Sequence, residues 1–108
     1  MNAAAKKAII SKHTVLSSTN WADISNSVGS NESIVITDII CSSNASSSTI
    51  TVAAYDGSTR TNLLVLNSQE DRTESINLVT PIHVAEGQRI QGQTTQSSAY
   101  LTINYYVI

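Results

Sequence analysis

Apolar and polar residues alternate along most of this chain at every second position. Such alternation predicts β-strands that bury one face, because successive side chains of a strand point to opposite sides. No segment keeps the longer period of an amphipathic helix. We expect strands at Ala8–Leu16, Ala22–Val28, Ser33–Ser42, Thr49–Tyr55 and Leu63–Leu66, around Ile76 and Leu78, around Ile82 and Val84, and at Arg89–Thr94 and Ala99–Ile108.

The clearest of these patterns is Ser33–Ser42, which is apolar on both faces. A strand of this kind is typical of a central position in a sheet, covered on both sides or buried at an oligomer contact. Asp38 interrupts one face, and we expect it near the exposed end of the strand or hydrogen-bonded to a backbone N–H. Strict alternation assigns Ile34, Ile36 and Ile40 to one face and Val35, Ile39 and Cys41 to the other.

Turn signals separate the expected strands. Asn and Ser fill Ser42–Ser48, and Asp56-Gly57 and Glu86-Gly87 are pairs that favour tight turns. The polar segment Asn67–Ser75 is predicted to be an exposed loop. Pro81 either ends its strand or lies in an edge strand, since proline cannot donate a ladder hydrogen bond.

About eight short strands with frequent turns, and no helix to cover them, must pack sheet on sheet. We therefore expect an all-β, antiparallel β-sandwich with a Greek-key or jelly-roll topology. The length of 108 residues fits one domain. We divide the chain into an N-terminal arm at residues 1–12, expected to be flexible, and a single sandwich domain at residues 13–108.

Charge is scarce, at 13% of residues, and the formal net charge is −2. A weak overall field argues against a nucleic-acid partner. The chain also lacks an apolar run long enough to span a membrane, and its first residues lack the pattern of a secretion signal, so we expect synthesis in the cytoplasm. Cys41 stands alone, which excludes an intrachain disulfide and predicts a buried, inert thiol.

The inventory of reactive groups is thin. His13 and His83 are far apart and have no partner at metal-ligand spacing. Glu70, Asp71 and Glu74 fall close together, but without the Asp/Asn/Gly rhythm of a calcium loop. There is no nucleophile motif and no phosphate-binding glycine loop. We therefore expect no enzyme activity, no metal site and no cofactor.

The aromatic residues and the N-terminal lysines are the candidate contacts with partners. Trp21, Tyr105 and Tyr106 could anchor an interface or stack on a ligand, although a tyrosine packed at a strand end with a solvated hydroxyl is the plainer alternative. All three lysines lie in the arm while the rest of the chain is acidic. A basic arm could contact an acidic surface of a partner or a neighbouring subunit, or serve solubility alone. The candidate interface is therefore Lys6, Lys7, Lys12, Trp21, Tyr105 and Tyr106.

The order of motifs from Trp21 to the last residue resembles a known family. The carrying segments are "SIVITDIICSSNASSSTITVAAYDG", "INLVTPIHVAEGQRIQGQT" and "AYLTINYYVI". Together they resemble the small jelly-roll decoration, or cement, proteins that trimerise on the capsid exterior of tailed bacteriophages. The resemblance implies a homotrimer, a major capsid protein as partner, a location on the virion exterior and a structural role without catalytic residues.

Two other functions stay open at this point. One is a carbohydrate- or receptor-binding β-sandwich module of a phage tail or fibre, which should bring aromatics, Asp and Asn together in one groove. The other is a subunit of a non-viral assembly. The sequence alone does not show whether Trp21 and the tyrosines converge.

Overall fold

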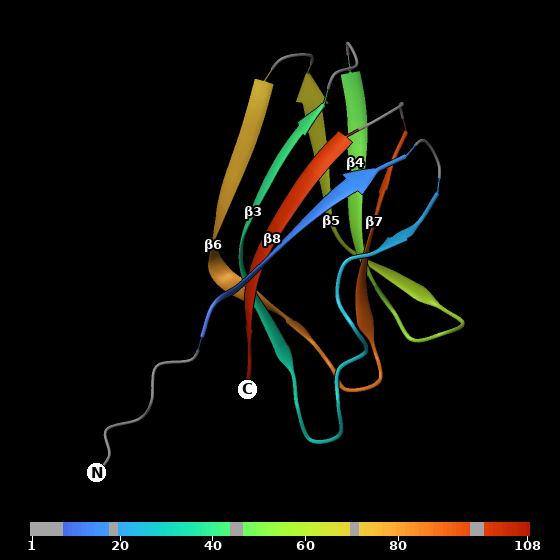
Figure 1. Cartoon of the computed structure of the whole chain (residues 1–108), viewed down its shortest axis with the longest axis vertical. Helices are drawn as coiled ribbons and strands as arrows, with labels where there is room; N and C mark the ends of the chain where they lie inside the picture. The colour runs from blue at the N-terminus through green and yellow to red at the C-terminus, as the bar shows by residue number, and fades with distance from the viewer. Residues whose placement is uncertain (1–7, 18–19, 44–46, 70–71, 96–98) are drawn as a thin grey trace.

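The computed structural model describes residues 8–17, 20–43, 47–69, 72–95 and 99–108, all in strands, turns or irregular segments. Figure 1 shows two layers of strands packed face to face. None of the described segments forms a helix that could cross a membrane. The strands are β1 (Ile10–Leu16), β2 (Ala22–Asp23), β3 (Ile34–Ser43), β4 (Ser47–Tyr55), β5 (Arg60–Gln69), β6 (Arg72–Val84), β7 (Arg89–Thr94) and β8 (Ala99–Val107).

The strand order identifies the topology as a jelly roll. One sheet, here called sheet A, has the order β1-β8-β3-β6, and the other, sheet B, has the order β2-β7-β4-β5. The first strand therefore pairs with the last, the second with the second to last, and so on inward to β4 and β5, always antiparallel. This is a long hairpin rolled up so that β3 also meets β8 and β4 also meets β7. The expected antiparallel β-sandwich with a jelly-roll topology is confirmed.

The core lies between the two sheets and consists almost entirely of aliphatic side chains. Burying each of them contributes on the order of 1.5–3 kcal/mol, before the entropy of ordering the chain is subtracted. Alternation correctly predicted the inward side of β4, where Ile50, Val52 and Ala54 point into the core. The largest fully buried apolar side chains are Leu16, Ile36, Ile39, Ile50, Ile90, Leu101, Ile103, Val35, Val52 and Val84.

The face assignment for β3 was wrong, because a bulge interrupts the strand. The register with both β6 and β8 shifts between Ile36 and Asp38. An extra residue in one strand reverses the side to which all later residues point. Ile34, Ile36, Ile39 and Cys41 therefore share the core, whereas Val35 is buried outside the core cluster.

Two further expectations are corrected at segment boundaries. The predicted strand Ala22–Val28 is a ladder only at Ala22–Asp23; beyond it Ile24 and Val28 still donate to the carbonyls of Ile90 and Gln88, but irregularly. The predicted loop Asn67–Ser75 is instead mostly strand, because β5 and β6 continue to Gln69 and from Arg72. Polar residues are tolerated there because both strands lie at sheet edges and present one face to solvent.

The sandwich begins earlier in the chain than the predicted boundary between residues 12 and 13. β1 begins at Ile10, so Lys12 belongs to a paired strand of sheet A rather than to a separate arm. Pro81 lies within β6, an edge strand, as the absence of its N–H requires. Gly57 and Gly87 adopt positive φ values of 103° and 81°, which confirms the two predicted turns.

Candidate interaction surfaces

The outer face of sheet B carries a cluster of arginine and aromatic side chains. The Arg60 guanidinium lies 4.8 Å from the centre of the Trp21 ring and 4.4 Å from that of Tyr55. The Arg89 guanidinium lies 4.9 Å from the same Tyr55 ring. Cross-strand pairing explains this convergence, because Tyr55 on β4 faces Arg60 on β5 and Arg89 on β7. We call these four residues the arginine–aromatic cluster.

Asp23 fixes this cluster from one side. Its Oδ1 accepts hydrogen bonds from Gln91 Nε2 at 2.6 Å and from Arg89 Nε at 2.9 Å. Gln91 Oε1 in turn accepts from Arg60 Nε at 2.8 Å. The hydrogen bond from Gln91, followed by the bond and charge of Arg89, lowers the pKa of the Asp23 carboxyl. The result is a preorganised polar surface that presents guanidinium and ring faces together.

The outer face of sheet A has a polar belt across its middle. Asn104 on β8 is bonded to both neighbouring strands: Ser11 Oγ on β1 donates to its Oδ1 at 2.5 Å, and its Nδ2 donates to Asp38 Oδ2 on β3 at 3.0 Å. Thr37, in the bulge, donates to Asp38 Oδ1. Asp38 was expected near a strand end or bonded to backbone; its partners are instead side chains within the sheet.

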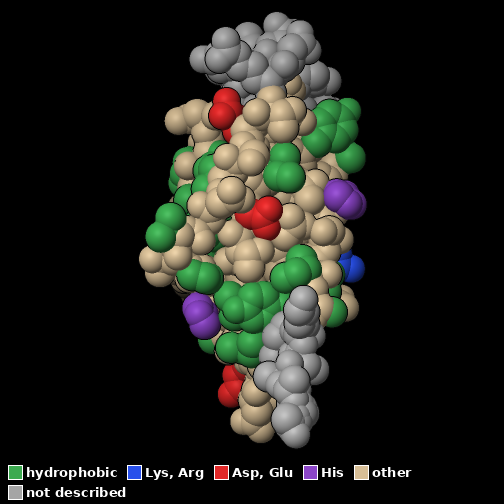
Figure 2. All heavy atoms as spheres, turned by 90° about the vertical axis from the view of Figure 1, so that its left-hand side faces the viewer, with side chains coloured by type: hydrophobic (Ala, Val, Ile, Leu, Met, Phe, Trp, Pro, Cys, Tyr) green, Lys and Arg blue, Asp and Glu red, His purple; other side chains and the backbone are tan. Residues whose placement is uncertain are grey.

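Apolar side chains gather below this belt, toward the chain ends, as the green area in the lower part of Figure 2 shows. Val35 is buried there although it lies outside the core cluster, and it faces Tyr106 on β8. Ile9, which precedes the Ile10–Tyr105 pair of β1 and β8, is 57% exposed, and Ile108, which follows the end of β8, is 47% exposed. Ile108 is held in place by backbone hydrogen bonds to Ser33 in both directions. We call Ile9, Val35, Tyr106 and Ile108 the outer apolar patch.

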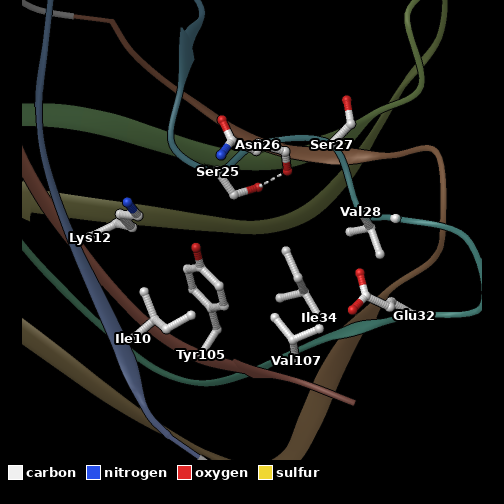
Figure 3. A pocket seen from close by; sticks show the side chains of 11 residues that line it. Ile10, Lys12, Ser25, Asn26, Ser27, Val28, Glu32, Ile34, Tyr105 and Val107 are labelled. Carbon is white, nitrogen blue, oxygen red and sulfur yellow. Dashed lines mark hydrogen bonds between the residues drawn. The ribbon is translucent and has the colours of Figure 1, made fainter.

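A pocket of about 260 Å³ lies between β1 and β8 of sheet A and the segment that follows β2. Figure 3 shows the Tyr105 ring pointing into it. Burial raises the pKa of the Tyr105 hydroxyl. The side chains of Ile10, Ile34, Tyr105, Val107 and Val28 form the apolar part of the lining, and Lys12, Ser25, Asn26, Ser27, Gly29 and Glu32 complete it.

The structure does not bring the predicted interface residues together on one surface. Trp21 lies on the outer face of sheet B and Tyr106 on the outer face of sheet A. Tyr105 points the other way from Tyr106, and it shares the pocket with Lys12. Lys6 and Lys7 lie outside the described residues.

The predicted interface did not include Tyr55, Arg60, Arg89 or Asp23. Asp23 and Arg89 are distant from the Tyr55–Arg60 hairpin along the chain, and only the strand register places them beside it. Asp56-Gly57 after Tyr55 did mark a hairpin, so the approach of Arg60 to Tyr55 had a local signal.

The described residues include no group of three or more potential metal ligands. Glu70 and Asp71 lie outside the described part. His13 pairs with the Thr102 hydroxyl at 2.8 Å on the outer face of sheet A. Cys41 is free and buried, and burial, with the nearby Glu74 charge, raises the pKa of its thiol. That thiol lies in the apolar core and not in a cleft.

Known proteins resemble this chain in fold. No family model and no curated protein matches it. The nucleoplasmin-like N-terminal domain of Drosophila FKBP39 superposes with a TM-score of 0.51 at 10% identity, over 91% of this chain and 88% of that one. The Drosophila NLP core, whose structure is described as providing insight into pentamer formation and histone binding, superposes with a TM-score of 0.51 at 14% identity, over 91% of this chain and 97% of that one.

A third similar structure is a pentameric capsid protein from metagenomic phage sequences, with a TM-score of 0.50 at 13% identity. The match covers 89% of this chain but 60% of that one, so the capsid protein has a substantial part with no counterpart here. At such identities, the three likenesses show a shared β-sandwich fold.

Proposed function

We propose that this chain is a non-enzymatic structural protein of a bacteriophage virion, a decoration protein that binds the outer surface of the head and stabilises it. The observation that carries the proposal is the rolled eight-strand sandwich, on which a pentameric phage capsid protein superposes over 89% of this chain. The motif resemblance to decoration proteins points to the same setting from the sequence. The described surfaces offer contacts of the kind that interfaces use, in the outer apolar patch and the arginine–aromatic cluster.

Self-assembly is part of this proposal. The outer apolar patch exposes aliphatic groups around Tyr106, and a ring of identical subunits would bury them. The resemblance favours a trimer, whereas two structures of similar fold are described as pentameric or pentamer-forming. The trimer remains a prediction, and the mass in solution, three or five times 11.5 kDa, distinguishes the two.

A pair of variants tests whether the patch is the subunit contact. Ile108→Lys places a charge on the patch, and Val65→Lys places the same charge on a residue of similar exposure in sheet B, 53% against 47%. We expect Ile108→Lys to sediment as a smaller species while Val65→Lys keeps the parent mass. Equal behaviour of the two variants would place the contact elsewhere.

The proposed partner is the major capsid protein, and the basic N-terminal segment is a second contact. Deleting residues 1–7 removes Lys6 and Lys7. We expect the shortened protein to bind undecorated heads more weakly at low salt, with the difference shrinking at high salt because screening weakens exposed ion pairs. Unchanged binding at both salt concentrations rejects this role for the segment.

The arginine–aromatic cluster supports a second candidate, a carbohydrate-binding module of a tail or fibre. Trp21 and Tyr55 share one face with Asp23 and Gln91, which is the set a sugar site uses. However, Arg60 already lies over both rings, so a sugar would have to displace its guanidinium. Glycan binding that disappears in Trp21→Ala would favour this alternative.

A further inference from the structure

The pocket beside β1 contains a buried tyrosine hydroxyl that makes no hydrogen bond with any described residue. Tyr105 is 5% exposed, and its hydroxyl points into the pocket. Within the part of the chain that the structure describes, this hydroxyl makes no hydrogen bond. A buried polar group left unpaired is unfavourable, and a jelly-roll core could hold phenylalanine here instead. The hydroxyl is therefore suited to an acceptor that enters the pocket.

A positive charge lies next to this hydroxyl. Across the β1–β8 pairing, Ile10 faces Tyr105 and Lys12 faces Ile103, so Lys12 is the diagonal neighbour of Tyr105 on the same side of the sheet. Lys12 also lines the pocket and makes no ion pair with a described residue. An ammonium group and a phenol donor side by side match a carboxylate, which accepts hydrogen bonds from both.

The opposite end of the pocket has the opposite charge. Figure 3 shows Lys12 and Glu32 on opposite sides, with Ile34 and Val107 between them. Glu32 makes no ion pair with a described residue either. The volume of about 260 Å³ equals that of roughly nine waters at ~30 Å³ each, which suits a ligand of about that many heavy atoms.

We propose that this pocket binds a small aliphatic zwitterion, a chain of several methylene groups with a carboxylate at one end and an amine at the other. The carboxylate pairs with Lys12 and accepts from the Tyr105 hydroxyl, the methylenes lie on Ile34 and Val107, and the amine pairs with Glu32. This site is separate from the outer apolar patch, so the inference is independent of the proposed role in the virion.

The test uses the full chain and 6-aminohexanoate as the probe, followed by changes in backbone amide NMR signals. We expect shifts confined to Lys12, the segment 25–29, Glu32 and the end of β8. Tyr105→Phe, which keeps the ring, and Lys12→Met should each weaken binding at least about tenfold, as expected for hydrogen bonds to a charged group. The matched control is Tyr100→Phe on the other side of β8, 50% exposed and outside both the pocket and the outer apolar patch, which should bind as the parent does.

Two analogues separate the two charged ends. Hexanoate lacks the amine and hexylamine lacks the carboxylate, so both should bind more weakly than 6-aminohexanoate. Binding of hexanoate equal to that of the zwitterion overturns the role of Glu32. Equal binding by Tyr105→Phe and the parent overturns the role of the hydroxyl, and absence of shifts at probe concentrations of about 20 mM overturns the site, because a ~1 mM site would be nearly full.

Discussion

The bulge in β3 makes two adjacent isoleucines unequal, and this difference can be measured. Ile39 is 1% exposed and belongs to the core cluster, whereas Ile40 is half-buried and lies outside it. Truncating a fully buried isoleucine to alanine costs about 2–5 kcal/mol through lost transfer energy and the cavity that remains. For the half-buried neighbour, roughly half the transfer term applies and no closed cavity forms, so we expect about 1 kcal/mol.

Urea unfolding of Ile39→Ala, Ile40→Ala and the parent measures these costs. A domain of this size has a total stability of about 5–15 kcal/mol, so Ile39→Ala removes a large share. With a slope of about 2 kcal/mol per molar urea, the midpoint should fall by about 1–2.5 M for Ile39→Ala and by about 0.5 M for Ile40→Ala. One protein concentration must be used throughout, because self-assembly would make stability concentration-dependent.

The outcome that refutes the reasoning is a cost for Ile40→Ala equal to or larger than that for Ile39→Ala. That result would mean that β3 alternates without a bulge, because Ile40 would then share the core-facing side with Ile34 and Ile36. The comparison therefore tests the register of the central strand directly, with a neighbour of identical chemistry as its control.

Three further predictions concern single groups. Gly92→Ala should destabilise the fold by about 1–2 kcal/mol in urea unfolding, because its Cβ would lie 3.0 Å from both Ile24 Cδ1 and Leu101 Cδ2, and overpacking outweighs the usual gain over glycine; equal or higher stability would contradict this packing. Asp23 should titrate below the ordinary value of 3.8 in carboxyl NMR. Because its pKa is lowered in the folded protein, its contribution to stability is present above pH 3.8 and is lost as pH falls through the folded pKa. In a Gln91→Ala variant the titration midpoint of Asp23 should move back up, and an unmoved midpoint counts against the hydrogen bond from Gln91 as the cause. The Cys41 thiol should react with a thiol reagent at pH 8 far more slowly in the folded protein than in urea, because it is buried and its pKa is raised; equal rates would show that β3 is accessible.

Much of the fold was predictable because most strands follow strict alternation. β4 and β8 have no interruption, so counting every second residue correctly identified Ile50 and Leu101 as core. β3 could not be resolved this way, since its bulge depends on Thr37 and Asp38 meeting Asn104, a residue far along the chain. Local sequence does not encode such a partner.

The candidate surfaces were predictable only in part. Opposite directions for Tyr105 and Tyr106 follow from alternation, and the structure places them so. The arginine–aromatic cluster joins four strands whose register comes from the rolled topology, which the sequence does not specify. The high polarity of Asn67–Ser75 led to the wrong prediction of a loop, because an edge strand with one solvated face can have the same composition as a loop.

The most direct test of the proposed role is a cryo-electron-microscopy map of the phage particle that carries this protein. We predict density for the rolled sandwich on the outer surface of the head, in symmetric groups of identical subunits, with the outer apolar patch facing a neighbouring copy. Density located only in the tail or fibres, or single copies with that patch open to solvent, would contradict the account.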